Sequence, residues 1–144
     1  MRKTDLAWAA GFFDGEGCVS ASVRGSKQYM NLCTHVSNTN KPAILHFHTI
    51  AGCGTVRRHV GATHYSLRRR MIWEWYGYLG PVKPFLTELL PYLLIKKQEV
   101  KLFLKLADGR RWSGNGRRAY TTQQKQQRLG IVQKIKRLKK REWK

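Results

Sequence analysis

Two carboxylates, Asp14 and Glu16, stand on either side of Gly15 at the end of an apolar segment. The chain has only 8 acidic residues against 28 Lys and Arg residues, so two acids this close together are conspicuous. Carboxylate oxygens suit Mg²⁺, a hard ion that keeps several of its waters and bridges readily to phosphate oxygens. The alternative for Glu16 is an exposed carboxylate at a helix end with no chemical role.

The net charge of +20 at pH 7 indicates a polyanionic partner. Neutralising phosphates releases counterions, so many dispersed cations favour nucleic acid. On charge alone, a basic protein of the ribosomal or chromatin type is as good an interpretation as an enzyme. No apolar run is long enough to cross a bilayer and the first residues do not form a signal peptide, so we expect a soluble intracellular protein that does not bind membranes.

The segment that leads to the two carboxylates, residues 6–13, is predicted to be a helix. Small residues recur along it at a spacing of four, at Ala7, Gly11 and Gly15, and therefore share one side. A glycine inside a helix costs roughly 1 kcal/mol relative to alanine, so Gly11 needs a reason. Close approach of a second copy of this helix is one reason, and simple tolerance of glycine near a helix end is the alternative.

After residue 17 the pattern changes from helical to alternating. Residues 18–24 and 29–36 are predicted to form a β-hairpin around a turn at 25–28. The polar residues 37–40 and Pro42 favour the start of a helix, which Gly52 ends. A second hairpin is expected at residues 54–60 and 63–69.

The second half of the chain is predicted to be mostly helical. We expect a short aromatic helix at residues 71–79, another at 84–90, and a longer one from Pro91 to about residue 107. A loop at 108–118 precedes a basic helix that Thr121 or Thr122 caps and that reaches about residue 140. No linker divides the chain. We therefore expect one domain of residues 1–144, with a core at about 5–107 and a basic C-terminal loop and helix at about 108–144.

Residues 9–17, Ala-Ala-Gly-Phe-Phe-Asp-Gly-Glu-Gly, resemble the signature of LAGLIDADG homing endonucleases, in the variant that ends Asp-Gly-Glu-Gly and with Ala in the place of the first Leu. Three downstream segments are also similar to the family: residues 37–41, 52–56 and 91–98. The resemblance covers about the whole chain. It implies an α+β fold, with an αββαββα core, a saddle-shaped antiparallel sheet and, in this chain, extra C-terminal helices.

The resemblance also implies a homodimer, because family members with one motif pair two copies and this chain has one motif. Two copies would meet through their motif helices and would read a nearly palindromic site in double-stranded DNA. The residues expected at the dimer interface are Ala7, Gly11, Asp14 and Gly15.

Roles at the end of the motif helix follow from the same resemblance. Glu16 is the expected metal ligand, with the backbone carbonyl of Gly15 beside it, and Mg²⁺ is the expected ion, with Mn²⁺ as an alternative. Lys96 matches the family's lysine near the active site, although the neighbouring Lys97 leaves the register open by one residue. Asn38 matches a position that orients solvent, and a helix N-cap role is an equal alternative. The expected catalytic residues are Glu16, Lys96 and Asn38.

DNA contacts are expected on the sheet face opposite the core, where Arg side chains contact guanine and smaller polar groups act through water. A register slip of one residue would exchange the whole set for its neighbours. Strand alternation places the following residues on that face: Ser20, Ser22, Arg24, Tyr29, Asn31, Cys33, His35, Arg57, His59, His64, Ser66 and Arg68. The basic tail at 110–144 is expected to contact phosphates, or alternatively to be a solvated helix.

The resemblance thus predicts a site-specific, metal-dependent endonuclease. It would make a staggered cut in a long pseudo-palindromic site and promote the mobility of its host intron or a similar element. Two alternatives share the fold: an intron RNA maturase, which would bind RNA, and a DNA-binding relative that does not cleave. The presence of both Glu16 and Lys96 disfavours the relative that does not cleave, because a dead site has no chemical need for either.

Overall fold

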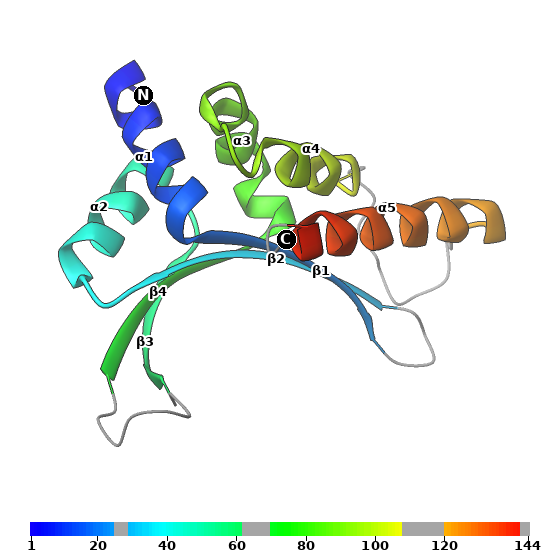
Figure 1. Cartoon of the computed structure of the whole chain (residues 1–144), viewed down its shortest axis with the longest axis horizontal. Coiled ribbons are helices and arrows are strands. Elements are labelled where there is room, and N and C mark those ends of the chain that lie inside the picture. Colours follow the sequence, from blue (N-terminus) through cyan, green and yellow to red (C-terminus); the bar gives the residue numbers. More distant parts are fainter. Residues whose placement is uncertain (25–28, 62–69, 108–119, 142–144) are drawn as a thin grey trace.

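The computed structural model of the chain describes residues 1–24, 29–61, 70–107 and 120–141. Helices cover one side of a curved, four-stranded antiparallel sheet, and the concave side carries no helix of the described chain (Figure 1). The strand order is β1-β2-β4-β3. The elements in chain order are α1 (Lys3–Glu16), β1 (Gly17–Arg24), β2 (Tyr29–Asn38), α2 (Lys41–Ala51), β3 (Thr55–Gly61), β4 (Arg70–Tyr78), α3 (Leu79–Leu89), the 3₁₀ turn η1 (Leu90–Tyr92), α4 (Lys97–Lys105) and α5 (Thr122–Arg141). The order α-β-β-α-β-β-α with added helices is the expected one, and no described helix is long and apolar enough to span a membrane.

Helix α1 runs directly into β1 without a loop. Its inner side buries Leu6, Ala9, Ala10 and Phe13 against the sheet and the other helices. At the junction, a Cβ on Gly17 would lie 2.6 Å from the ring and the carbonyl oxygen of Phe13. Only glycine permits this abrupt change from helix to strand. The junction therefore holds the end of the motif helix at the middle of the molecule.

Helix α2 has the start and the end that the sequence predicts. The Asn40 side chain accepts a hydrogen bond of 3.0 Å from the backbone N–H of Ala43, which satisfies one of the free donors of the first turn. Pro42 occupies that turn, and Gly52 ends the helix in the left-handed conformation, at φ 63°.

Trp75 anchors the centre of the sheet against the helices. It is fully buried, pairs with Val36 on one side and Val56 on the other, and donates a 2.7 Å hydrogen bond from Nε1 to the carbonyl oxygen of Cys53. Directly paired residues of an antiparallel sheet share a face, so these three residues face the helices. Their sequence neighbours must face the open, concave side.

The aromatic helix predicted at residues 71–79 is wrong, because these residues form β4. Trp73, Trp75 and Gly77 alternate with Glu74 and Tyr76, and aromatic residues of this kind fit a half-buried strand. The strand predicted at residues 63–69 lies outside the described residues. Helix α3 then begins at Leu79, five residues before the predicted start.

The long helix predicted to begin at Pro91 is also wrong. Pro91 lies in the short turn η1, Leu93 is extended, and α4 begins only at Lys97. The break occurs because residues 94–96 donate their backbone N–H groups to the side chain of Asp14 and not to the preceding turn.

Helix α5 packs on α4 and β1, and Val132 and Ile135 join the buried core. Its start is the expected one: Thr121 and Gln124 exchange side-chain to backbone hydrogen bonds of 3.0 and 3.2 Å, a capping box. The buried core of the domain therefore includes the basic C-terminal helix.

Candidate active site and nucleic-acid interface

Glu16 is the last residue of α1, and its side chain is exposed. Helix C-termini carry carbonyl oxygens without partners and a partial negative charge, so a cation is favoured there even without the carboxylate. Gly15 beside it is exposed as well, and a Cβ placed on it would meet no atom within 4 Å. The two predicted metal-binding groups therefore lie together at an open helix end.

Asp14 differs from Glu16 although only Gly15 separates them. It is 8% exposed, and its two carboxylate oxygens accept hydrogen bonds from the backbone N–H groups of Leu94, Ile95 and Lys96, at 2.7, 3.1 and 2.8 Å. Three donors within one chain occupy this carboxylate, so Glu16 is the acid left to bind a metal ion. Any contribution of Asp14 to a dimer interface stays a prediction.

Lys96 lies at the end of the motif helix, 82 residues from Asp14 in sequence. Its backbone N–H donates to the Asp14 carboxylate and its Nζ donates to the Asp14 carbonyl oxygen. Lys97 instead donates from Nζ to the carbonyl oxygen of Pro91, at 3.2 Å. Lys96, and not Lys97, therefore contacts Asp14, and its role at an active site stays a prediction.

Asn38 is the last residue of β2, two positions beyond Val36, which pairs with Gly17 at the end of α1. Its side-chain oxygen accepts a 2.8 Å hydrogen bond from the backbone N–H of Asn40. The N-cap of α2 is Asn40, so the N-cap role considered for Asn38 is wrong. Its role in orienting solvent remains a prediction.

The first hairpin presents the face that alternation predicted. Val19, Ala21 and Val36 are buried under the helices, whereas the residues of opposite parity pair across the open face. Those pairs are Cys18 with His35, Ser20 with Cys33 and Ser22 with Asn31, and Arg24 pairs with Tyr29 at the hairpin end. Cys33 differs from its neighbours on this face because its side chain is buried, at 7% exposed.

The second half of the face consists of β3 and β4. Arg57 and His59 lie on it as predicted, while His64, Ser66 and Arg68 lie outside the described residues. β4 adds Glu74 and Tyr76, which the sequence analysis missed because it expected a helix there. The alternation of residues 72–78 was the signal that could have found them.

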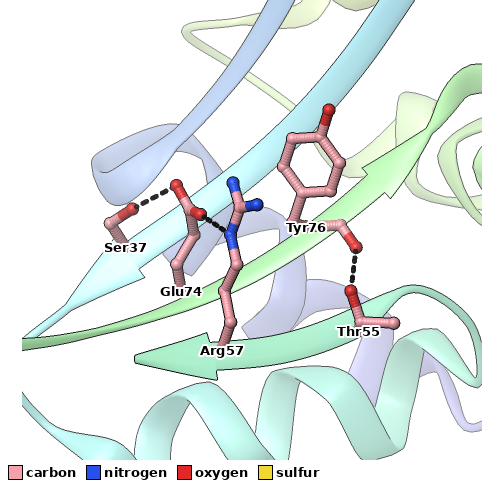
Figure 2. A network of polar contacts seen from close by, with 5 residues as sticks. All are labelled: Ser37, Thr55, Arg57, Glu74 and Tyr76. Atoms are coloured by element: carbon pink, nitrogen blue, oxygen red, sulfur yellow. Dashed lines mark hydrogen bonds and ion pairs between the residues drawn. The ribbon is translucent and has the colours of Figure 1, made fainter. Parts of the chain in front are cut away.

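A polar network crosses this face from β2 to β3 (Figure 2). Arg57 donates from Nε to Oε2 of Glu74 at 2.5 Å, and Ser37 donates from Oγ to Oε1 of the same carboxylate at 3.3 Å. The guanidinium carbon of Arg57 lies 4.3 Å from the centre of the Tyr76 ring, a cation–π contact. Burial, followed by hydrogen bonds to Cys33 and Tyr78, raises the pKa of Tyr76, so its hydroxyl stays protonated.

His35 lies beside this network. Burial lowers its pKa below the ordinary value of 6.5; Glu74 opposes this shift, whereas Lys139 and Arg57 add to it. His35 is therefore uncharged at neutral pH and can accept as well as donate a hydrogen bond.

Known proteins share this sequence and this fold, although no family model matches the chain. The DNA endonuclease I-CvuI of Chlorella vulgaris is 31% identical over 111 residues, which cover 70% of this chain and 62% of that protein. The solved structure of the homing endonuclease I-CvuI with its target superposes with a TM-score of 0.71 at 23% identity, over 94% of this chain and 82% of the other. The LAGLIDADG meganuclease I-AabMI bound to uncleaved DNA gives a TM-score of 0.60 at 17% identity, over 88% of this chain and 43% of the other.

The chain is similar to LAGLIDADG endonucleases in sequence and shares their fold. Its motif helix, its open four-stranded sheet and its order of elements are those of the family fold. The chain spans less than two thirds of the length of I-CvuI.

One chain has few groups that could bind a metal ion. Among the residues that the structure describes, no three His, Cys, Asp or Glu side chains gather into a group that could hold a metal ion. A single carboxylate with a nearby carbonyl nevertheless fits Mg²⁺, which is commonly bound by one or two carboxylates plus waters and phosphate oxygens. The remaining ligands must then come from DNA, water or a second copy.

Lys139 adds a cation that the sequence analysis did not single out. Its Nζ lies 2.9 Å from Sγ of Cys18 and donates to the carbonyl oxygen of Val19. The last turns of α5 therefore attach to the free edge of β1, two residues after Glu16. This contact brings part of the basic helix close to the candidate active site.

Proposed function

We propose that this chain is a metal-dependent endonuclease that hydrolyses phosphodiester bonds at a specific site in double-stranded DNA. The observation that carries the proposal is the exposed Glu16 at the end of α1, two residues after the Asp14 that binds Lys96 and beside an open sheet face of a +20 chain. An endonuclease needs these two features together: a surface that binds DNA and a carboxylate that can hold a metal ion at the phosphate.

The solved structures of I-CvuI contain DNA together with Ca or Mg, and we propose a divalent ion for this chain as well. Glu16 and the carbonyl of Gly15 would hold Mg²⁺, with Mn²⁺ as an alternative. When bound, the ion makes the attacking water more acidic and stabilises the charge that develops on the phosphate. Lys96, fixed by its bonds to Asp14, provides a positive charge beside that phosphate. Asn38 would orient the attacking water.

A homodimer is part of the proposal. Ala7, Gly11 and Gly15 are exposed along α1, and the two glycines are not explained by the chain's own packing, since a Cβ on either would meet nothing within 4 Å. Leu94 and Ile95, which bond to Asp14 through their backbones, are 84% and 66% exposed. A second copy would cover this apolar surface and bring two Glu16 side chains together, one for each DNA strand.

The proposed target is a long pseudo-palindromic site cut with a stagger, inside the cell, and the biological result is mobility of a host intron or similar element. Cleavage selection from a randomised duplex library with Mg²⁺, coupled to a mass measurement in solution, tests these points. A dimeric mass and a palindromic, staggered product are expected. A monomer that binds RNA and leaves all DNA intact would overturn the proposal in favour of a maturase.

The decisive variant is Glu16→Gln. It removes the charge that holds the ion and keeps the shape, so we expect cleavage to fall at least about a hundredfold while DNA binding remains. Glu88→Gln is the matched control, because Glu88 is an exposed acid on α3 and not part of the site. Full cleavage by Glu16→Gln would exclude Glu16 as the metal ligand.

A further inference from the structure

Arg57 is a basic side chain of the open face that two neighbouring side chains constrain. The Glu74 carboxylate accepts its Nε–H, and the Tyr76 ring lies against its guanidinium plane, so the group is held from two directions (Figure 2). An arginine on a protein surface normally samples many rotamers, and ordering it costs side-chain entropy. Here the protein alone has already fixed the side chain before any partner binds.

Glu74 is an unusual residue for a surface that meets DNA. The side chain is 11% exposed, against 56% for Arg57, and both of its oxygens are used, by Arg57 and by Ser37. A carboxylate facing phosphates is repelled by them, so its presence needs a reason. The contacts supply one: Glu74 links β2 to β3 and fixes the direction of the Arg57 side chain.

The contacts with Glu74 and Tyr76 leave one edge of the Arg57 guanidinium group, the edge with Nη1 and Nη2, available to a partner. Nε is occupied, whereas Nη1 and Nη2 donate to no acceptor in the part of the chain that the structure describes. Two parallel N–H donors in one plane match O6 and N7 of guanine in the major groove, and a lysine could not reproduce this pair.

We propose that Glu74 and Tyr76 hold Arg57 in position to recognise one guanine in each half of the DNA target. Arg57 is then a specificity-determining residue, and Glu74 and Tyr76 are positioning residues that act through it. This inference rests on the proposed function and deepens it, because it names a base that the target must contain.

The competing role for Arg57 is a phosphate contact, and the two roles differ in a measurable way. Loss of a phosphate contact weakens binding to all sequences about equally and lowers the salt dependence of binding. Loss of a guanine contact relaxes the preference at one position and leaves the others unchanged. Arg58 is the matched control, since it is the next residue, is exposed, and lies on the opposite face of β3 beside Trp73.

The test is a binding selection from a randomised duplex library in the presence of Ca²⁺, with the full chain and its variants. Wild-type sites should carry one guanine per half-site that is preferred about ten- to hundredfold, as expected for a bidentate arginine contact. Arg57→Gln should abolish that preference and leave the other positions intact, and Arg58→Gln should keep it. Glu74→Gln and Tyr76→Leu should each weaken it severalfold, whereas Tyr76→Phe, which keeps the ring, should retain it.

Three results would overturn the inference. Arg57→Gln could weaken binding uniformly, which is the phosphate outcome, or Glu74→Gln and Tyr76→Leu could leave the guanine preference unchanged. A wild-type protein that selects sequences without such a guanine also contradicts it, while the proposed endonuclease stands. If no sequence is enriched at all, the proposed function fails as well. Circular dichroism of each variant shows whether it is folded. Because Arg57 is exposed, Arg57→Gln should fold even if Glu74→Gln does not, so the guanine contact can still be tested.

Discussion

The end of α1 and the open face of the sheet each contain one buried carboxylate that fixes a basic side chain. Asp14 positions Lys96, and Glu74 positions Arg57. Asp14 does so through three backbone N–H groups, whereas Glu74 relies on the side chains of Arg57 and Ser37. Every residue except proline has a backbone N–H, so the three bonds to Asp14 should survive most substitutions at positions 94–96. The arrangement of Glu74 with Arg57 and Ser37 depends on side chains, so substitutions at these positions can alter it and with it the DNA sequence that is recognised.

This difference predicts unequal effects on stability. Asp14→Asn puts an amide NH₂ against buried backbone donors, so we expect a loss of about 3 kcal/mol in the free energy of unfolding. Glu74→Gln keeps an acceptor for Ser37 and should cost about 1 kcal/mol. Urea unfolding of both variants measures this contrast. Equal losses would mean that the two carboxylates are anchored alike. Asp5→Asn, near the exposed start of α1, is the control and should change the free energy of unfolding little.

Gly15→Ala tests whether the end of α1 is open because a second copy approaches it. Inside one chain a Cβ here meets nothing, and the higher helix propensity of alanine should stabilise the monomer by up to about 1 kcal/mol. The mass in solution should nevertheless shift from dimer to monomer. Gly130→Ala on α5, where a Cβ also meets nothing, is the control and should leave the mass unchanged. A dimeric Gly15→Ala protein would contradict the proposed interface.

The smallest expected effect is a pH dependence from the open face. The pKa of His35 is lowered in the folded chain, chiefly by burial and also by Lys139 and Arg57, with Glu74 opposing. The unfolded chain therefore takes up a proton near pH 6.5 that the folded chain does not. Stability falls as pH drops from about 6.5 towards the lower folded-state pKa and levels off below it.

His35→Gln should remove this part of the pH dependence. The comparison of urea midpoints between pH 8 and pH 5 for wild type and variant checks it. An identical pH profile for the two proteins would show that His35 titrates alike in the folded and unfolded states.

Part of this architecture follows from local patterns. The alternation of residues 18–24 and 29–36, the helix start within residues 37–42 and the helix end at Gly52 each depend only on neighbours in the chain, and the structure has them as predicted, although the cap is Asn40 and not Asn38. β4 was missed because a run of aromatic residues suits either a helix or a strand, and its pairing partners lie on β2 and β3, up to 45 residues away (Cys33 and Tyr78). The polar network of Glu74 and Tyr76 was missed together with the strand.

By itself the sequence determined the motif, the excess of positive charge, the two acids at the end of a helix, and the alternation of the first hairpin. The tertiary structure decided which acid is exposed, which is buried, and which lysine contacts the buried one. Asp14 and Glu16 look equivalent in sequence, as do Lys96 and Lys97. They differ because the chain returns after 80 residues and offers its backbone N–H groups to Asp14 alone. Such a contact depends on how the helices pack on the sheet, so it cannot be predicted from the spacing of residues along the chain.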